Sequence, residues 1–208
     1  MLLFNLFTNP LMFLGFVIAI LVAITVHEFS HAFLANTYGD PTAKMMGRVS
    51  LNPLAHLDLT GTVFLLLAGF GWGKPVIVNP SNFKNPKLDN LTVSLAGPIS
   101  NLFLAIILGL VYRFFNFTGF IGELIFLVIF FNLVLMIFNL IPIPPLDGSK
   151  ILALFTSEET FLRLQQLGIP ILFAILIFSS FFYPIIPALL SRAVGFFFTI
   201  ITGKPVMI

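Results

Sequence analysis

The sequence predicts an all-α polytopic membrane protein with about four to six transmembrane helices, a re-entrant segment and a small membrane-associated β-sheet. Of its 208 residues, 59% are hydrophobic and only 9% are charged, which leaves too little polar surface to cover a water-soluble globule. The mean hydropathy is +1.09. Several apolar runs approach the ~20 residues that a helix needs to cross about 30 Å of hydrocarbon. Lipid is therefore the expected solvent for most of the chain.

Four apolar runs are long enough to span a bilayer: residues 11–35, 91–112, 119–141 and 169–190. The run at residues 59–71 is too short to cross, and we interpret it as re-entrant or interfacial. The tail at residues 193–202 is also short, and its pattern leaves open whether it spans together with residues 184–190. Between residues 43 and 80, Gly, Pro and Asn alternate with two short apolar segments, 48–51 and 75–78, which we predict to be strands.

We expect one integral-membrane domain over residues 1–208, with a motif-bearing core at about 11–156 and C-terminal helices at about 165–203. The chain has no cysteine, which removes disulfides and thiolate metal ligands. Its net charge of +2 is too small to indicate nucleic-acid binding. The first residues lack a basic region and a small-residue cleavage site, so we expect the first apolar run to be retained.

Basic residues predict the orientation. If the first span ends on side A, four crossings place seven basic residues on side A and two on side B. Those on side A are Lys44, Arg48, Lys74, Lys84, Lys87, Lys150 and Arg163, and those on side B are Arg113 and Arg192. Since Lys and Arg are enriched in cytoplasmic loops, side A is predicted to be the cytoplasm. The third span also ends there, so the polar segment that follows it reaches the same depth as the polar end of the first span.

Three ionisable residues interrupt the first span near its cytoplasmic end: His27, Glu28 and His31. The spacing of four puts both imidazoles on one face of a helix, where they can bind one zinc ion while Glu28 acts as a base. Ionisable groups within a span cost several kcal/mol unless they are paired or bound to metal. The alternative interpretation is a polar cluster that packs helices together or lines a solvent path.

A catalytic zinc takes three protein ligands and leaves one position open. In a chain without cysteine, the third ligand must be an Asp, a Glu or His56. Asp147 is the preferred candidate, because the topology brings it to the depth of the histidines and a glycine follows it. Its alternative role is the N-cap of the next helix. His56 is expected at the membrane interface instead. Asn132 is expected to form hydrogen bonds between helices. The same structural role is the alternative to a functional role for Asn101.

Together these residues resemble the site-2 proteases, a family of zinc metalloproteases that cut inside the membrane. The resemblance rests on the pattern His27-Glu28-Phe-Ser-His31 and on the segments 51–58, 72–76, 95–101 and 139–148. These motifs occur in order over residues 20–155. The chain resembles a short form of the family, since it has no insertion long enough for a PDZ domain and no nucleotide-sensing module.

The resemblance implies that His27, His31 and Asp147 hold one zinc ion per chain and that Glu28 is the catalytic carboxylate. It suggests that Asn139 binds the substrate peptide or stabilises the transition state, and that the two predicted strands clamp an unwound substrate. The expected function is an intramembrane zinc endopeptidase that cleaves transmembrane protein substrates near the cytoplasmic face, as in regulated intramembrane proteolysis. The expected location is the cell membrane of a prokaryote, with the lipid bilayer as the surrounding partner.

A rival from another class is a non-catalytic membrane protein that binds or transports metal with the same ligands. A transporter needs a polar route across the whole bilayer, whereas the side B halves of the spans are filled with Phe and Leu. Membrane zinc proteases that process prenylated proteins are a further alternative. They need a different third-ligand motif, for which the chain has no candidate.

Overall fold

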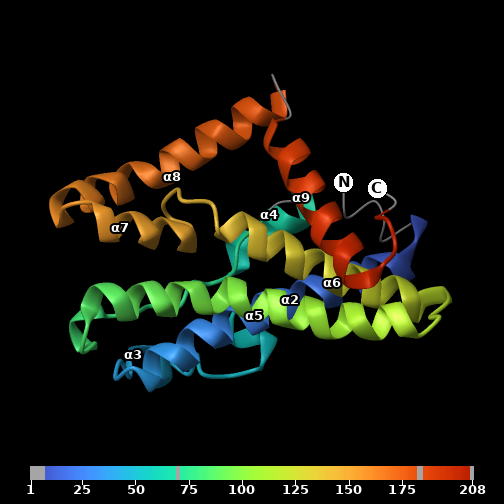
Figure 1. Ribbon diagram of the computed structural model, residues 1–208, viewed down its shortest axis with the longest axis horizontal. Helices are drawn as coiled ribbons and strands as arrows, with labels where there is room; N and C mark the ends of the chain where they lie inside the picture. Colours follow the sequence, from blue (N-terminus) through green and yellow to red (C-terminus); the bar gives the residue numbers. More distant parts are fainter. Residues whose placement is uncertain (1–7, 69–70, 182–184, 207–208) are drawn as a thin grey trace.

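The computed structural model describes residues 8–68, 71–181 and 185–206, and these are mostly helical (Figure 1). Four helices are long and apolar enough to cross a membrane: α2 (Pro10–Thr37), α5 (Pro86–Phe114), α6 (Gly119–Asn139) and α9 (Ile185–Thr202). Shorter or more polar helices lie between them: α3 (Thr42–Met45), η1 (Pro53–Ala55), α4 (Leu59–Ala68), η2 (Pro80–Asn82), η3 (Asp147–Ile151), α7 (Leu152–Phe155) and α8 (Glu158–Phe181). The architecture agrees with the predicted multi-pass class.

Helices α2, α5 and α6 pack against one another in pairs and form the centre of the molecule (Figure 1). Helix α9 covers α5 and α6, and its Phe198 is buried with Ala105 and Leu133 in the largest apolar cluster. The C-terminal ends of α5 and α9 meet, since the Lys204 Nζ atom lies 4.4 Å from the centre of the Tyr112 ring. Helix α9 crosses α5 at a steep angle and meets it at this end (Figure 1).

The start and end of α2 follow local sequence rules. The Asn9 side chain accepts a hydrogen bond of 3.1 Å from the Met12 N–H, and Pro10 occupies the first helical position, where its missing N–H costs nothing. The helix ends before Gly39, whose φ of 105° is accessible to glycine at little cost. An uninterrupted helix of 28 residues results.

Asp40 ties the end of α2 to the segment that leads into α5. Its buried carboxylate accepts hydrogen bonds from the Thr42 N–H at 3.1 Å, the Asn79 N–H at 2.7 Å and the Asn82 side-chain amide at 2.7 Å. Burial acts to raise the pKa of the Asp40 carboxyl, but the hydrogen bonds from Thr42, Asn79 and Asn82 outweigh it and hold the pKa below its ordinary value. This carboxylate therefore fixes how the chain turns from α2 back to α5.

The fourth predicted span, residues 169–190, is wrong. Its residues belong to two helices, because α8 ends at Phe181 and α9 begins at Ile185, and residues 182–184 lie outside the described part. Only α9, which includes the tail at 193–202, is among the candidate spans. Pro187 fits the start of a new helix here, since it lies in the first turn of α9, where the N–H that proline lacks has no partner within the helix.

The predicted sheet is not supported by the described residues. Segments 48–51 and 75–78 lie outside regular secondary structure, and the bridge seen in this region is the isolated antiparallel pair of Leu57 and Gly73. Side chains bind backbone groups that a sheet would pair. Arg48 donates to the Pro75 carbonyl, and Glu28 accepts from the N–H of the following residue. The segments are thus held in place without forming strands.

The run at residues 59–71 contains α4, a helix of 10 residues, which is too short to span, as its length predicts. The helix folds back on the segment that follows it. The centre of the Phe64 ring lies 5.4 Å from that of Trp72, and Gly61 lies directly against the Trp72 carbonyl. A re-entrant path through the bilayer is not supported by the described residues.

Candidate metal centre

His27 and His31 belong to a stripe of α2 that repeats every fourth residue and faces α5. The other members of this stripe are Ala19, Ala23 and Ala35, and each of these alanines is completely buried. Small side chains allow two helices to approach closely. The two imidazoles are therefore enclosed between α2 and α5, with exposed fractions of 5% and 7%.

Three potential metal-binding atoms converge at this point. The Nε2 atoms of His27 and His31 lie 3.1 Å apart, and the Asp147 Oδ2 atom lies 3.1 Å from the first and 3.3 Å from the second. The ligand atoms of the three residues all lie within 4.8 Å of one another. The structure thus brings together the three side chains that the sequence proposes as ligands, although their roles stay a prediction.

The second ring nitrogen of each histidine has an acceptor on α5. The Nδ1 atom of His27 lies 2.6 Å from the Asn101 Oδ1 atom, and that of His31 lies 2.7 Å from the Val93 carbonyl oxygen. Both partners can accept a hydrogen bond from Nδ1, an arrangement that leaves the lone pair of each Nε2 atom available to a metal ion. This is the arrangement that orients histidine as a metal ligand.

The orientation of the Asn101 amide is set by its own partners. Its Nδ2 group donates to the Ala23 carbonyl at 3.0 Å and to the Asn132 Oδ1 atom at 2.7 Å. Asn132 in turn donates to the Val128 carbonyl at 2.7 Å. The predicted inter-helix hydrogen bonding of Asn132 is confirmed. Both amides are completely buried. Because the Asn101 Nδ2 group is used in these hydrogen bonds, its oxygen is the atom that faces His27.

The donor set fits a bound cation. Two imidazole lone pairs and one carboxylate oxygen point at one another, and the buried Asp147 Oδ2 atom has no hydrogen-bond donor. Three converging acceptors repel one another unless a positive charge lies between them. Two histidines and one carboxylate are a ligand set of catalytic zinc sites.

Gly97 on α5 leaves open the space beside these atoms. A Cβ atom at this position would lie 2.7 Å from the Nε2 atom of His27, and closer still to that of His31. Any side chain larger than hydrogen would therefore occupy the point where the ligand atoms meet. Gly97 falls in segment 95–101, which contributes to the resemblance, but the sequence assigned it no role at the site.

Asp147 reaches the histidines from the turn that follows α6. The glycine after it packs against the backbone of Leu140, where a Cβ would clash, so the chain can fold back tightly beneath the end of α6. Lys150 lies in the same 3-10 turn, η3. Burial lowers the pKa of the Lys150 ammonium group, and the Asp147 charge offsets this in part. The predicted N-cap role of Asp147 is not seen, since η3 has no side-chain cap.

Glu28 lies beside the ligand group and is held by the backbone of a distant segment. Its Oε2 atom accepts a hydrogen bond of 3.1 Å from the Val76 N–H, and its Oε1 atom faces Gly73. This contact could not be predicted from the sequence, because a backbone N–H leaves no signal in a side-chain pattern. The carboxylate of the residue that follows His27 is thus held in place by the segment at residues 73–76.

The two other sequence candidates lie outside the ligand group. The Asn139 amide donates to the Leu135 carbonyl of its own helix at 3.1 Å. His56 is completely buried within the protein, and its Nε2 atom lies 2.7 Å from the Ser50 carbonyl oxygen. Among the residues that the structure describes, His56 is not part of the group that could hold a metal.

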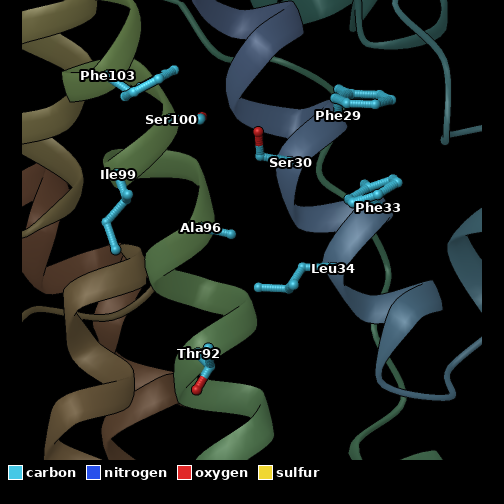
Figure 2. A pocket seen from close by; sticks show the side chains of 9 residues that line it. All are labelled: Phe29, Ser30, Phe33, Leu34, Thr92, Ala96, Ile99, Ser100 and Phe103. Atoms are coloured by element: carbon cyan, nitrogen blue, oxygen red, sulfur yellow. The ribbon is translucent and has the colours of Figure 1, made fainter. Parts of the chain in front are cut away.

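An apolar groove runs beside this site, between α2 and α5 (Figure 2). Some residues that line the groove are sequence neighbours of residues of the site. Ser30 precedes His31, Ala96 precedes Gly97, and further residues of the two helices complete it: Phe29, Phe33, Leu34, Thr92, Ile99, Ser100 and Phe103. None of the three candidate ligands lines the groove, so it is a lateral surface feature and not the metal site.

The chain matches the family described as Peptidase family M50 over residues 15–124 and 116–179. The matched region contains His27, Glu28, His31 and Asp147 and most of the described helices. The chain therefore belongs to Peptidase family M50, and its resemblance to the site-2 proteases is confirmed.

Named relatives agree with this family. The chain is 46% identical over 145 residues to "Putative zinc metalloprotease YwhC" of Bacillus subtilis, covering 65% of this chain and 66% of that protein. It is 34% identical over 164 residues to "Putative zinc metalloprotease Rip2" of Mycolicibacterium smegmatis, covering 73% and 62%. The match thus spans a little under two thirds of the length of both relatives. No solved structure matches the chain.

Proposed function

We propose that this chain is an intramembrane zinc endopeptidase that hydrolyses peptide bonds in or near transmembrane segments of membrane proteins, as in regulated intramembrane proteolysis. One observation carries the proposal. Three metal-binding atoms lie within 4.8 Å of one another at the end of a membrane-length helix, with a carboxylate beside them. Family membership and the names of the relatives support the same chemistry.

His27, His31 and Asp147 would hold one zinc ion per chain. When bound, zinc supplies a Lewis acid that polarises the scissile carbonyl and lowers the pKa of a water molecule toward neutrality. Glu28 accepts a proton from the attacking water and then passes it to the amine that leaves. The hydrogen bond from the Val76 N–H holds one carboxylate oxygen of Glu28 in place during both transfers.

Asn139 is the proposed substrate-binding or oxyanion-stabilising residue. Its amide has two N–H groups, one of which donates to the Leu135 carbonyl, so the other can donate to a substrate carbonyl. Loss of a donor of this kind lowers kcat by about 10²–10³ in other hydrolases. The position of Asn139 at the last residue of α6, eight residues before Asp147, supports this role.

The substrate must unwind before it is cut, because a helix hides its carbonyls in internal hydrogen bonds. We propose that the freed backbone pairs with Ile77 and Val78, whose backbone groups are not among those bound by Arg48, Glu28 and Asp40, in a segment that is neither helix nor strand. This pairing would form the membrane-associated sheet that the chain alone lacks in its described residues. The segment passes directly by Glu28, which supports its use as a guide for the substrate.

We place the protein in the cell membrane of a prokaryote, with the site near the cytoplasmic face. The excess of Lys and Arg on the side where the first span ends supports this orientation. The matched relatives from Bacillus subtilis and Mycolicibacterium smegmatis support the prokaryotic assignment. A site at this depth needs only a short polar inlet for water.

The proposal is tested with Glu28→Gln, assayed on a fluorogenic transmembrane peptide with purified protein in detergent. We expect turnover to fall to background while the zinc content stays near one per chain, because Glu28 is not a ligand. Glu123→Gln is the matched control, since Glu123 is exposed in the first half of α6, away from Asp147. Wild-type turnover in Glu28→Gln contradicts the proposal, and zinc flux across proteoliposomes would favour the transport alternative.

A further inference from the structure

Arg48 is a buried cation that has no carboxylate partner. Its side chain is in the loop after α3 and is 3% exposed, and no acidic group forms an ion pair with it among the residues described. The guanidinium donates to three backbone carbonyls instead, those of Ala55, Lys74 and Pro75. Burial of an unpaired charge costs free energy, which these carbonyls only offset in part. Such a costly group calls for a role beyond filling space.

The carbonyls that Arg48 binds lie directly before the N–H that binds Glu28. The Nη2 atom of Arg48 donates to Lys74 at 2.8 Å and to Pro75 at 2.9 Å. The next N–H along the chain, that of Val76, donates to the Glu28 Oε2 atom at 3.1 Å. One planar peptide group, between Pro75 and Val76, therefore connects the guanidinium to the carboxylate.

Planarity makes this connection rigid. In a trans peptide group the C=O and N–H bonds point in opposite directions and cannot turn independently. A guanidinium that holds the Pro75 oxygen therefore also sets the direction of the Val76 N–H. A charged donor on the carbonyl also polarises the peptide group and strengthens the N–H as a donor. The His56 carbonyl, which accepts from the Lys74 N–H at 2.8 Å, holds the same segment from the other side.

We propose that Arg48 is a positioning residue for Glu28, acting through the peptide group between Pro75 and Val76. The inference rests on the proposed function, because Glu28 is the residue that moves the proton there. Arg48 does not touch the reacting atoms. It keeps the carboxylate at the distance and angle at which proton transfer is productive, and small displacements of such groups are costly for the rate, about 10²-fold for 1 Å.

The test is a double-mutant cycle on the full chain in detergent. Arg48→Gln removes the guanidinium, and Val76→Pro removes the N–H that binds Glu28. We expect each change to lower kcat per zinc-loaded chain by at least about tenfold, with KM and zinc content unchanged. The double variant should be no slower than the slower single variant, because both changes break one connection. Arg113→Gln, at the opposite end of the bundle, should retain wild-type kcat.

A second readout is independent of turnover. Hydrogen exchange of the Val76 amide should be faster in Arg48→Gln than in the wild type, whereas Arg113→Gln should leave it unchanged. Losses in kcat that multiply in the double variant overturn the proposal, and so does a Val76 amide that exchanges at the wild-type rate in Arg48→Gln. If the wild-type chain hydrolyses no substrate, the proposed function fails, and the exchange experiment alone decides whether Arg48 orients this peptide group.

Discussion

Gly97 on α5 and His27 on α2 lie so close that a Cβ atom on the glycine would stand 2.7 Å from the Nε2 atom of the histidine. The site therefore depends on a missing side chain as much as on the side chains present. The groups that orient the imidazoles, Val93 and Asn101, flank Gly97 at intervals of four residues on the same helix. One face of α5 thus leaves space for the ligand atoms and sets their orientation.

Gly97→Ala is expected to abolish zinc binding. The added methyl group would occupy the space where the Nε2 atoms of His27 and His31 meet, so one of the rings or α5 must move. Elemental analysis of purified protein should show zinc falling from about one per chain to near zero. Gly195→Ala on α9 is the control, because no atom lies within 4 Å of the added methyl group. Full zinc occupancy in Gly97→Ala would mean that metal binds elsewhere.

Asn101→Ala is expected to weaken zinc binding without abolishing it. The change removes the acceptor that holds the His27 Nδ1 proton, and loss of such a partner typically lowers metal affinity 10–100-fold. Competition with a chromogenic chelator measures the affinity. Asn116→Ala, at an exposed position between α5 and α6, should have no effect. An unchanged affinity in Asn101→Ala would show that the ring keeps its orientation by other means.

Asp147→Ala is expected to lose zinc and turnover together. The carboxylate is the proposed third ligand, and removing it would leave two histidines in a site that needs three ligands. Zinc content and hydrolysis should fall in parallel, as they should when the wild-type protein is treated with a strong chelator. Undiminished zinc in Asp147→Ala would mean that another residue is the third ligand. His56 would then be the next residue to mutate.

Asp40→Asn is expected to destabilise the chain in a pH-dependent manner. The pKa of Asp40 is lower in the folded chain than its ordinary value of 3.8. The stabilisation is thus fully present above that value and is lost as the pH falls through the folded pKa. Hydrogen bonds to a charged group contribute about 1.5–3 kcal/mol each, and asparagine keeps only part of them.

The measurement for Asp40 is thermal unfolding in detergent from pH 7 down to pH 3. The wild type should exceed Asp40→Asn in Tm at pH 7, and the gap should narrow on acidification. Asp89→Asn, which removes the charge of an exposed carboxylate in the first turn of α5, controls for a general charge effect. A Tm gap that stays constant down to pH 3 would contradict the assigned role of the Asp40 charge.

Hydropathy and spacing predicted the first three membrane-length helices and the convergence of His27, His31 and Asp147. These features depend on side-chain type along the chain, which a sequence displays directly. The fourth span was misplaced because apolar length alone was counted, whereas Pro187 lies in the first turn of a new helix, α9. Side-chain patterns also failed to predict that the described residues lack the sheet. The two segments have the composition of strands, but side chains bind backbone groups that a neighbouring strand would otherwise pair.

The groups that surround the candidate site were harder to predict. The Val93 carbonyl and the Val76 N–H are backbone atoms, and any residue except proline could supply the N–H. Arg48 was counted as a cytoplasmic charge and as the first residue of a predicted strand, although its side chain is buried. The signal in the sequence was a charged residue, Arg48, among short apolar segments. Its role could not be predicted without knowing which carbonyl groups the folded chain brings near it.

The order of these elements along the chain has a consequence for biogenesis. Helix α2 leaves the ribosome about 60 residues before Val93 and Asn101, and more than 100 before Asp147. At the moment of insertion its two imidazoles therefore face lipid or the translocation machinery without any of their later neighbours. The three candidate ligands can meet only after α6 has followed α2 and α5 into the bilayer, so a metal ion bound by all three would report that these three helices have come together, before α9 is in place.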